Sequence, residues 1–143
     1  MISVTGIKEI DKALKGLPIQ LQDRILKNAH ADAAKPLIAT AKNIVPVGKT
    51  KNLQSSIGVE RVSLKKSNEV GLVQVGPRRK GGSKGFHGHL IEYGKTNRDG
   101  SKTTPQPFME PAFNQTKNEV EKNISQSIGR KLTLFLKRTL RNG

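Results

Sequence analysis

The stretch that decides the fold lies between residues 89 and 112. It reads His89-Leu-Ile-Glu-Tyr-Gly-Lys95, then a polar loop, then Thr104-Pro-Gln-Pro-Phe-Met-Glu-Pro-Ala112. Because proline fixes φ and is tolerated in a helix only in the first turn, the three prolines exclude a helix interior here. The pattern predicts a strand over 88–93, an exposed loop over 95–107 and a helix from Pro111.

No nucleophile–base pair, phosphate cradle or metal cluster occurs in this stretch. Its proline-bracketed part is instead typical of a rigid support for the chain. We expect a structural anchor made of Pro107, Phe108, Met109 and Pro111.

Helical periodicity is found on both sides of the middle of the chain. Apolar residues recur at helical spacing over 5–17, where Thr5 is the expected cap and Gly16 the expected end. The same spacing predicts long helices over 18–44 and 111–140, the first of them kinked at Pro36.

The middle of the chain alternates apolar and polar residues, as strands do. We expect strands at about 55–65 and 69–76, joined by a polar turn, with 88–93 as the third strand. The predicted fold class is α+β: an antiparallel β-sheet packed against two long helices and a short N-terminal helix, with long basic loops. At 143 residues we expect a single domain over 1–143.

The charge is strongly unbalanced, with 26 Lys and Arg against 11 Asp and Glu and a formal net charge of +15. Such an excess favours an acidic or polyanionic partner. Residues 76–88 combine five glycines with four basic residues and no acid, which predicts a flexible loop. Partner contacts are expected from the basic loops and from the acid between them, at Arg78, Arg79, Lys80, Lys84, Glu92, Lys95, Arg98 and Lys102.

The basic C-terminal helix is open to two interpretations. Arg130, Lys131, Lys137, Arg138 and Arg141 could contact phosphates or could be ordinary solvated charge, and the sequence favours neither. Aromatic residues for base stacking are nearly missing, so any nucleic-acid contact should be made to the backbone.

Several classes of protein are disfavoured by what the chain lacks. Without cysteine there is no disulfide framework or cysteine-based zinc site. The N-terminus does not resemble a signal peptide, and no apolar run approaches the roughly 20 residues that span a bilayer. Gly48-Lys49-Thr50 lacks the first glycine of a Walker A motif. We expect no cofactor, no metal and no membrane partner.

Two histidines and two glutamates are the remaining candidates for chemistry. His87 and His89 flank a glycine, but a metal site needs three or four ligands. Glu92 and Glu110 could form an acid–base pair. The surrounding excess of Arg and Lys makes salt bridging the better interpretation of Glu92, as an anchor for the basic loop or for a neighbouring subunit.

The order of short motifs resembles the tail-completion, or head–tail connector, proteins of long-tailed bacteriophages of the lambdoid type. The motifs that carry the resemblance are Gly6-Ile7, Leu17-Pro18, Val45-Pro46-Val47, Leu53-Gln54-Ser55-Ser56-Ile57, Glu92-Tyr93-Gly94 and Pro107-Phe108-Met109-Glu110-Pro111-Ala112. They cover roughly residues 3–115. The chain departs from the pattern at Gly48-Lys49-Thr50, which replaces Thr-Gly, and at Lys95, which replaces Thr.

The resemblance implies a structural, non-enzymatic protein at the neck or tail end of a virion, assembled in the host cytoplasm. Such proteins form a ring, here expected to be a hexamer, which completes the tail and helps join it to the DNA-filled head. The implied partners are further copies of the chain, head-completion, tail-terminator or tail-tube proteins, and non-specifically the phage DNA in the lumen.

Two alternatives from other classes stay open. One is a small basic nucleic-acid-binding module, supported by charge alone. The other is a small basic ribonuclease that uses His87, His89, Glu92 and an arginine.

Overall fold

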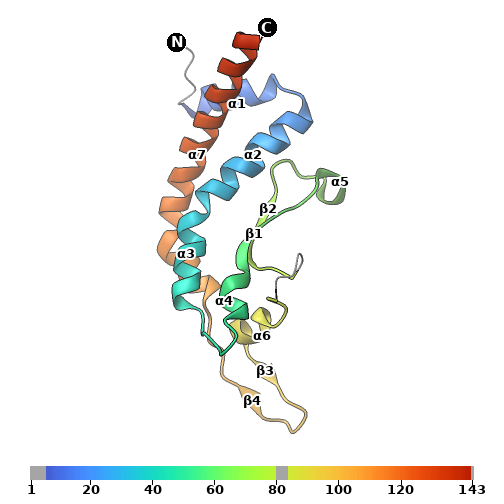
Figure 1. Ribbon diagram of the computed structural model, residues 1–143, viewed down its shortest axis with the longest axis vertical. Coiled ribbons are helices and arrows are strands. Elements are labelled where there is room, and N and C mark those ends of the chain that lie inside the picture. The colour runs from blue at the N-terminus through green and yellow to red at the C-terminus, as the bar shows by residue number, and fades with distance from the viewer. Residues whose placement is uncertain (1–5, 80–83, 143) are drawn as a thin grey trace. The chain divides into compact units, whose positions relative to one another are not determined.

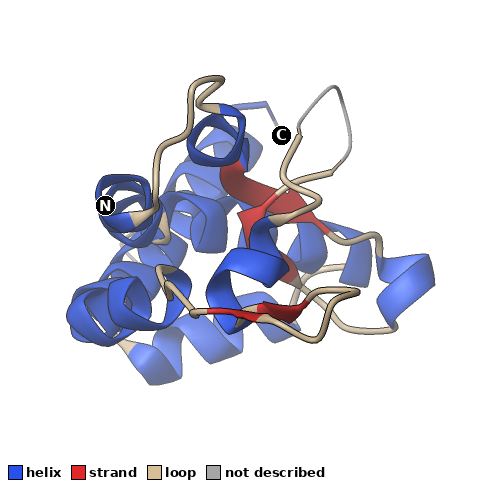
Figure 2. Ribbon diagram, turned by 90° about the horizontal axis from the view of Figure 1, so that it is seen from below, coloured by secondary structure: helices blue, strands red, loops and turns tan. Residues whose placement is uncertain are grey.

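The structure is a computed structural model that describes residues 6–79 and 84–142 (Figure 1). Its elements in chain order are α1 (Ile7–Lys15), α2 (Ile19–Ala33), α3 (Lys35–Ile44), α4 (Asn52–Ser56), β1 (Ile57–Arg61), α5 (Leu64–Ser67), β2 (Val73–Pro77), α6 (Gly88–Tyr93), β3 (Lys95–Thr96), β4 (Lys102–Thr103) and α7 (Met109–Asn142). Helices make up most of the described chain, and the strands are short (Figure 2). The fold is α+β, as predicted.

The chain gathers into two compact units. The first comprises the described parts of Met1–Ala34, Arg61–Gln74 and Glu119–Gly143, and the second comprises Lys35–Glu60 and Val75–Asn118. The long helix α7 begins in the second unit and ends in the first.

The first unit is built on α1, α2 and the C-terminal part of α7, which lie side by side in Figure 1. Its buried core consists of Ile10, Ile25, Ala29, Ile128 and Leu132. These residues come from the predicted apolar stripes. Ala29 is completely buried, and its small side chain lets a neighbouring element approach α2 closely.

The expected helix over 18–44 is divided at its proline. α2 ends at Ala33, with Ala34 as its C-cap, and α3 begins at Lys35. Pro36 therefore lies in the first turn of α3, where a missing backbone N–H leaves no hydrogen bond unmade. Glycines flank α1, which begins after Gly6 and ends at Lys15, with Gly16 as its C-cap. Thr5, the expected cap, lies outside the described residues.

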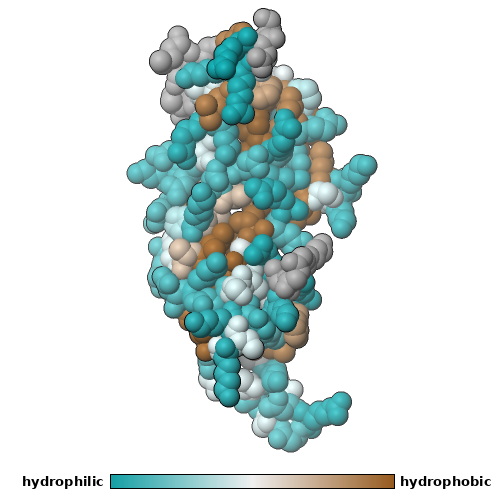
Figure 3. All heavy atoms as spheres, viewed as in Figure 1, coloured by the Kyte–Doolittle hydropathy of each residue, from teal (hydrophilic) through white to brown (hydrophobic). Residues whose placement is uncertain are grey.

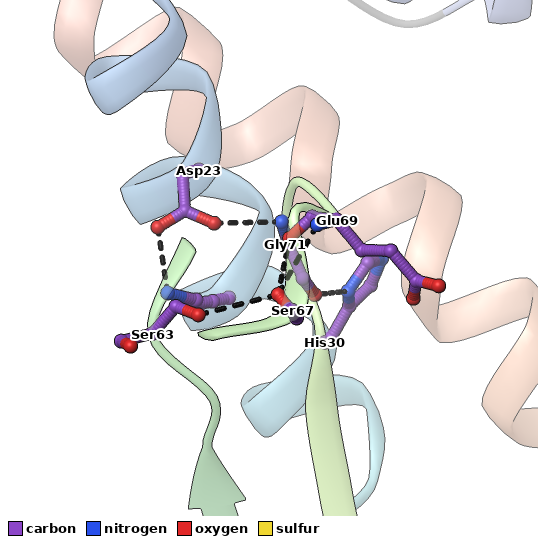
Figure 4. A network of polar contacts seen from close by, with 7 residues as sticks. Asp23, His30, Ser63, Ser67, Glu69 and Gly71 are labelled. Atoms are coloured by element: carbon purple, nitrogen blue, oxygen red, sulfur yellow. Dashed lines mark hydrogen bonds and ion pairs between the residues drawn. The ribbon is translucent and has the colours of Figure 1, made fainter. Parts of the chain in front are cut away.

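A turn between β1 and β2 is fastened to α2 by side chains (Figure 4). Asp23 Oδ1 accepts the Gly71 N–H at 2.8 Å, and His30 Nδ1 lies 2.7 Å from the Gly71 carbonyl oxygen. Asp23 Oδ2 also pairs with Lys27 Nζ at 2.6 Å. Both polar groups of the Gly71 backbone are thus held by one face of α2, since Asp23 and His30 are two helical turns apart.

The pKa of Asp23 reflects this environment. Burial by itself would raise it, but the hydrogen bonds from Lys27 and from the Gly71 N–H, together with the Lys27 charge, bring it below its ordinary value. The carboxylate form is therefore the one that the native fold stabilises.

The predicted hairpin over 55–76 exists, but with fewer strand residues. β1 and β2 form a two-stranded sheet, and the Val62 N–H donates to the Leu72 carbonyl at 3.1 Å. Residues at both ends of the first predicted strand are helical, in α4 and α5. The apolar residues change phase between Val59 and Val62, because β1 ends at Arg61 and the chain approaches α5 there.

The strand predicted at 88–93 is wrong, because these residues form the helix α6. Short apolar runs fit a helix turn as well as a strand. The Leu90 N–H donates to the His87 carbonyl at 3.1 Å, which starts the turn. Conversely, the region expected to be loop, 95–107, contains a second two-stranded antiparallel sheet, β3 with β4. The sheet is thus not the three-stranded one that we expected.

Candidate partner-binding surface at the β3–β4 hairpin

The carboxylate of Glu92 holds the start of α7. Its Oε2 accepts the N–H groups of Phe108 at 2.8 Å and Met109 at 3.0 Å, and its Oε1 accepts that of Glu110 at 3.1 Å. Glu92 is 8% exposed. The first N–H groups of a helix have no partner within the helix, and they form a natural binding site for a negative charge. Glu92 thus caps α7 from another element.

Gly94, the next residue but one, sends the chain into the hairpin. Its φ is +75°, and an added Cβ would lie 2.5 Å from the Thr103 carbonyl oxygen. Glycine is therefore required by both conformation and space. On the other side, the Gln106 N–H donates to the Ile91 carbonyl at 2.8 Å, which ties the end of the hairpin region back to α6.

The tip of the hairpin is organised by its own polar groups. Asp99 Oδ1 accepts the Ser101 N–H at 2.9 Å and the Ser101 hydroxyl at 2.6 Å, and the Asn97 N–H donates to the Ser101 carbonyl at 2.7 Å. The hydrogen bond from the Ser101 hydroxyl, followed by that from its N–H, lowers the pKa of Asp99. The tip is therefore preorganised without any apolar core.

Every residue from 95 to 107 is exposed. The segment that carries β3 and β4 is coloured teal to white in Figure 3, as expected for polar residues. Register pairs Lys95 with Thr103 and Thr96 with Lys102, so Lys95 and Lys102 point to opposite faces of the hairpin. Arg98 stands in the tip. The hairpin thus presents positive charge in several directions.

Tyr93 stands at the base of the hairpin and is 78% exposed. It lines a hollow of about 540 Å³ together with both hairpin strands. It also lines a second hollow of about 330 Å³, whose wall includes Pro77, Arg79, Phe108 and Met109. Tyrosine is enriched among the residues that contribute most to binding at protein interfaces, so Tyr93 is a candidate contact. No sequence pattern marked it as one, although it is the only tyrosine in the chain.

The basic loop before α6 divides into residues with different roles. Arg78 Nε donates to the Ser56 carbonyl at 3.1 Å, and its guanidinium lies over Gly58, where a Cβ would come within 2.8 Å of Nε. Arg78, which we expected at a partner interface, is thus engaged within its own unit. Arg79 and Lys84 are exposed, and Lys80 lies outside the described residues.

The expected anchor residues also differ among themselves. Phe108 is 1% exposed and belongs to the largest fully buried side chains. Met109 and Pro111 are half-buried, whereas Pro107 is exposed. Glu92, proposed as an anchor for the basic loop or a neighbouring subunit, instead binds the backbone that follows Pro107.

The candidate chemistry finds little support in this geometry. Both oxygens of Glu92 are engaged by backbone N–H groups, so the ribonuclease hypothesis loses its acid. The His87 ring packs edge-on against Phe86 at 5.3 Å. Within residues 6–79 and 84–142, no three His, Asp or Glu side chains are grouped as metal ligands would be. In the same part of the chain, no helix has the length and apolar character to cross a bilayer.

Comparison with known proteins gives one match. Residues 7–94, more than half of the chain, match the model of the HK97-gp10-like family, described as "Bacteriophage HK97-gp10, putative tail-component". No curated protein and no solved structure matches the chain. The matched region contains α1 to α6 and ends at Gly94, where the hairpin begins. The chain therefore belongs to the HK97-gp10-like family of bacteriophage tail components.

Proposed function

We propose that this tail component forms a ring at the neck end of the tail, completes the tail there and helps to join it to the DNA-filled head. The observation that carries the proposal is the β3–β4 hairpin with Tyr93 at its base. The hairpin buries no apolar residue, yet its tip is organised by hydrogen bonds and its base is fixed by Glu92.

The fold gains little stability from this hairpin, which suggests a role in binding a partner. An isolated two-stranded hairpin is marginally stable in water. Holding Lys95, Arg98 and Lys102 on a preorganised support lowers the entropy that is lost on binding. The proposed partners are the neighbouring copy in a hexameric ring and an adjoining head-completion, tail-terminator or tail-tube protein.

Positive charge on the hairpin suits an acidic protein surface. Two acids lie at the hairpin, and both are engaged within the chain. Glu92 accepts hydrogen bonds from the start of α7, and Asp99 accepts them from the hairpin tip. The cations are thus left to an external partner, and Arg79 and Lys84 lie in the same unit as additional contacts. Tyr93 supplies the apolar area that charge alone does not provide.

The first test inactivates the gene in the phage and supplies the protein from a plasmid. Without the protein we expect separate heads and tails in negative-stain images, and with it joined particles. Purified protein imaged with such tails should form a ring at one end of the tail. Joined, infectious particles at wild-type yield in its absence would contradict the proposal.

The second test addresses the hairpin. Complementation with Lys95→Gln, Arg98→Gln and Lys102→Gln combined should lower the yield of joined particles by at least about tenfold. A matched control removes three exposed cations from the other unit, as Arg24→Gln, Lys65→Gln and Lys66→Gln. Equal yields from the two variants would show that the hairpin is not a contact surface.

A further inference from the structure

The C-terminal part of α7 carries a second concentration of positive charge. From Lys122 to the end of the chain there is no acidic residue, and six are basic. Among them, Lys131 forms an ion pair with another described residue: its Nζ lies 2.8 Å from Asp32 Oδ2. The ion pairs between described residues do not include Arg130, Lys137, Arg138 or Arg141, and all four are exposed.

Helix geometry brings these cations together. Arg130, Lys137 and Arg141 follow one another at intervals of seven and four residues, which places them on one face of α7, with Arg138 beside them. Ile128 and Leu132 lie in the core, so the basic face points away from it. We call Arg130, Lys137, Arg138 and Arg141 the α7 basic face.

Helix stability does not explain this arrangement. Cations near a helix C-terminus are favoured by the helix dipole, but only within the last turn. α7 ends at Asn142, and Arg130 is three turns earlier. Lys137 with Arg141 and Arg138 with Arg141 are like-charged neighbours at spacings of four and three, which destabilise a helix. A bound anion would remove that repulsion.

We propose that the α7 basic face binds the phosphate backbone of double-stranded DNA. The rise of about 1.5 Å per residue gives a distance of about 16 Å from Arg130 to Arg141. Along a duplex this corresponds to about five phosphates of one strand. Residues 122–142 contain no tyrosine or tryptophan to stack on bases, and the one aromatic residue of this segment, Phe135, packs against the core. The contact is therefore electrostatic and independent of base sequence.

Two other anionic partners fit the face less well. An anionic membrane would need a broad apolar surface on the same helix, whereas Leu134 and Leu140 are the exposed large apolar residues described in this segment. An acidic protein surface would be expected to meet an aromatic anchor, as at Tyr93, and the α7 basic face carries none. The proposal is independent of the ring, because binding is a property of the purified chain.

The test measures fluorescence anisotropy of a labelled 24-base-pair duplex with the full-length protein between 50 and 200 mM NaCl. Neutralising four phosphates predicts a slope of log K against log salt of about −3.6, and an affinity loss of about 100-fold across this range. The variant Arg130→Gln, Lys137→Gln, Arg138→Gln and Arg141→Gln should bind at least about tenfold more weakly at 100 mM NaCl, with a slope near zero.

A control variant removes the same charge elsewhere in the same unit, as Lys8→Gln, Arg24→Gln, Lys65→Gln and Lys66→Gln, all at exposed positions. It should keep its affinity within about threefold. Equal losses in the two variants would attribute binding to net charge and overturn the proposal. Preference for one duplex sequence, or binding to phosphatidylglycerol vesicles and not to the duplex, would also overturn it. Circular dichroism of both variants checks that α7 remains folded.

Discussion

Two turns of this protein are built in opposite ways. The turn at Gly71 is bound from outside, by Asp23 and His30 of α2. The turn at Gly100 is bound by Asp99, Ser101 and Asn97 of the same hairpin. At each turn a glycine has a positive φ and an aspartate accepts a backbone N–H, but Asp23 lies on α2 whereas Asp99 lies in the turn itself.

The two turns differ in whether their charged side chains are used within the fold. At Gly71, the backbone polar groups and the neighbouring lysine are all used by the fold. At the hairpin, the backbone is ordered while Lys95, Arg98 and Lys102 remain exposed. The same local chemistry thus supports the core in one place and leaves charge exposed in the other, where we propose that a partner binds. The following predictions test this contrast, in order of expected effect.

Phe108→Ala should give the largest loss, since it removes a fully buried aromatic ring at the base of the hairpin. We expect the free energy of unfolding in urea to fall by about 3–5 kcal/mol. Phe113→Ala is the matched control, because Phe113 lies five residues further along, in the first turns of α7, and is 52% exposed. It should cost about 1 kcal/mol or less, and equal losses would contradict the assignment of Phe108 as the anchor.

The two turn glycines should respond unequally to a methyl group. In Gly71→Ala the new Cβ would lie 2.6 Å from Leu26 Cβ, in a backbone conformation with φ of +78°. Strain and overpacking together should cost about 3 kcal/mol. Gly100 has a φ of +87° and no atom within 4 Å of its added Cβ, so Gly100→Ala should cost about 1 kcal/mol. Urea unfolding of both variants measures the difference.

Removing the aspartate that binds each turn should also cost more stability at Gly71 than at Gly100. Asp23→Ala leaves Lys27, which is 9% exposed, without its carboxylate partner and should cost about 2 kcal/mol. Asp99→Ala affects only an exposed tip and should lower the urea midpoint less than Asp23→Ala does.

Both carboxylates have a pKa below the ordinary 3.8. Each therefore stabilises the folded state fully above about pH 3.8, and this stabilisation is lost as the pH falls through the lowered pKa. Asp23→Asn should therefore flatten the acid limb of the stability curve. Unfolding measured in urea between pH 2 and 6 checks this, and an unchanged acid limb would contradict it.

The smallest effect on stability should come from the hairpin cations. Lys95→Gln, Arg98→Gln and Lys102→Gln combined should change the free energy of unfolding by less than about 0.5 kcal/mol, because these side chains are exposed. A loss comparable to that of Phe108→Ala would mean that the cations support the fold, and the hairpin would then resemble the Gly71 turn.

Much of the helical framework could be predicted from the sequence. Apolar stripes predicted α1, α2 and α7, and Pro36 predicted a kink in one helix where the structure has a break between α2 and α3. These signals are local, because a helix of several turns repeats its pattern. The prediction for residues 88–103 was wrong because the elements there are too short to repeat a pattern. Six residues cannot distinguish a helix from a strand by periodicity, and a hairpin of two-residue strands has no apolar alternation to detect.

The candidate site was only partly accessible to sequence reasoning. Composition marks Arg78 and Arg79 as equivalent, yet Arg78 binds the Ser56 carbonyl while Arg79 is exposed. That division depends on Gly58, twenty residues earlier, which leaves room for the guanidinium. Glu92 was expected to anchor the basic loop or a neighbouring subunit, whereas within the chain it binds the start of α7, a set of backbone N–H groups that no side-chain pattern reveals.

The cap made by Glu92 also bears on the order in which the chain folds. Glu92 and Phe108 are separated by sixteen residues, and closing that loop costs conformational entropy. The β3–β4 hairpin lies within the loop and brings Gly94 close to Thr103. Hairpins form in about 1–10 μs, so the hairpin can shorten the loop before the carboxylate reaches its three N–H groups. Nucleation of the longest helix in the protein is thereby coupled to a segment that contributes nothing to the core.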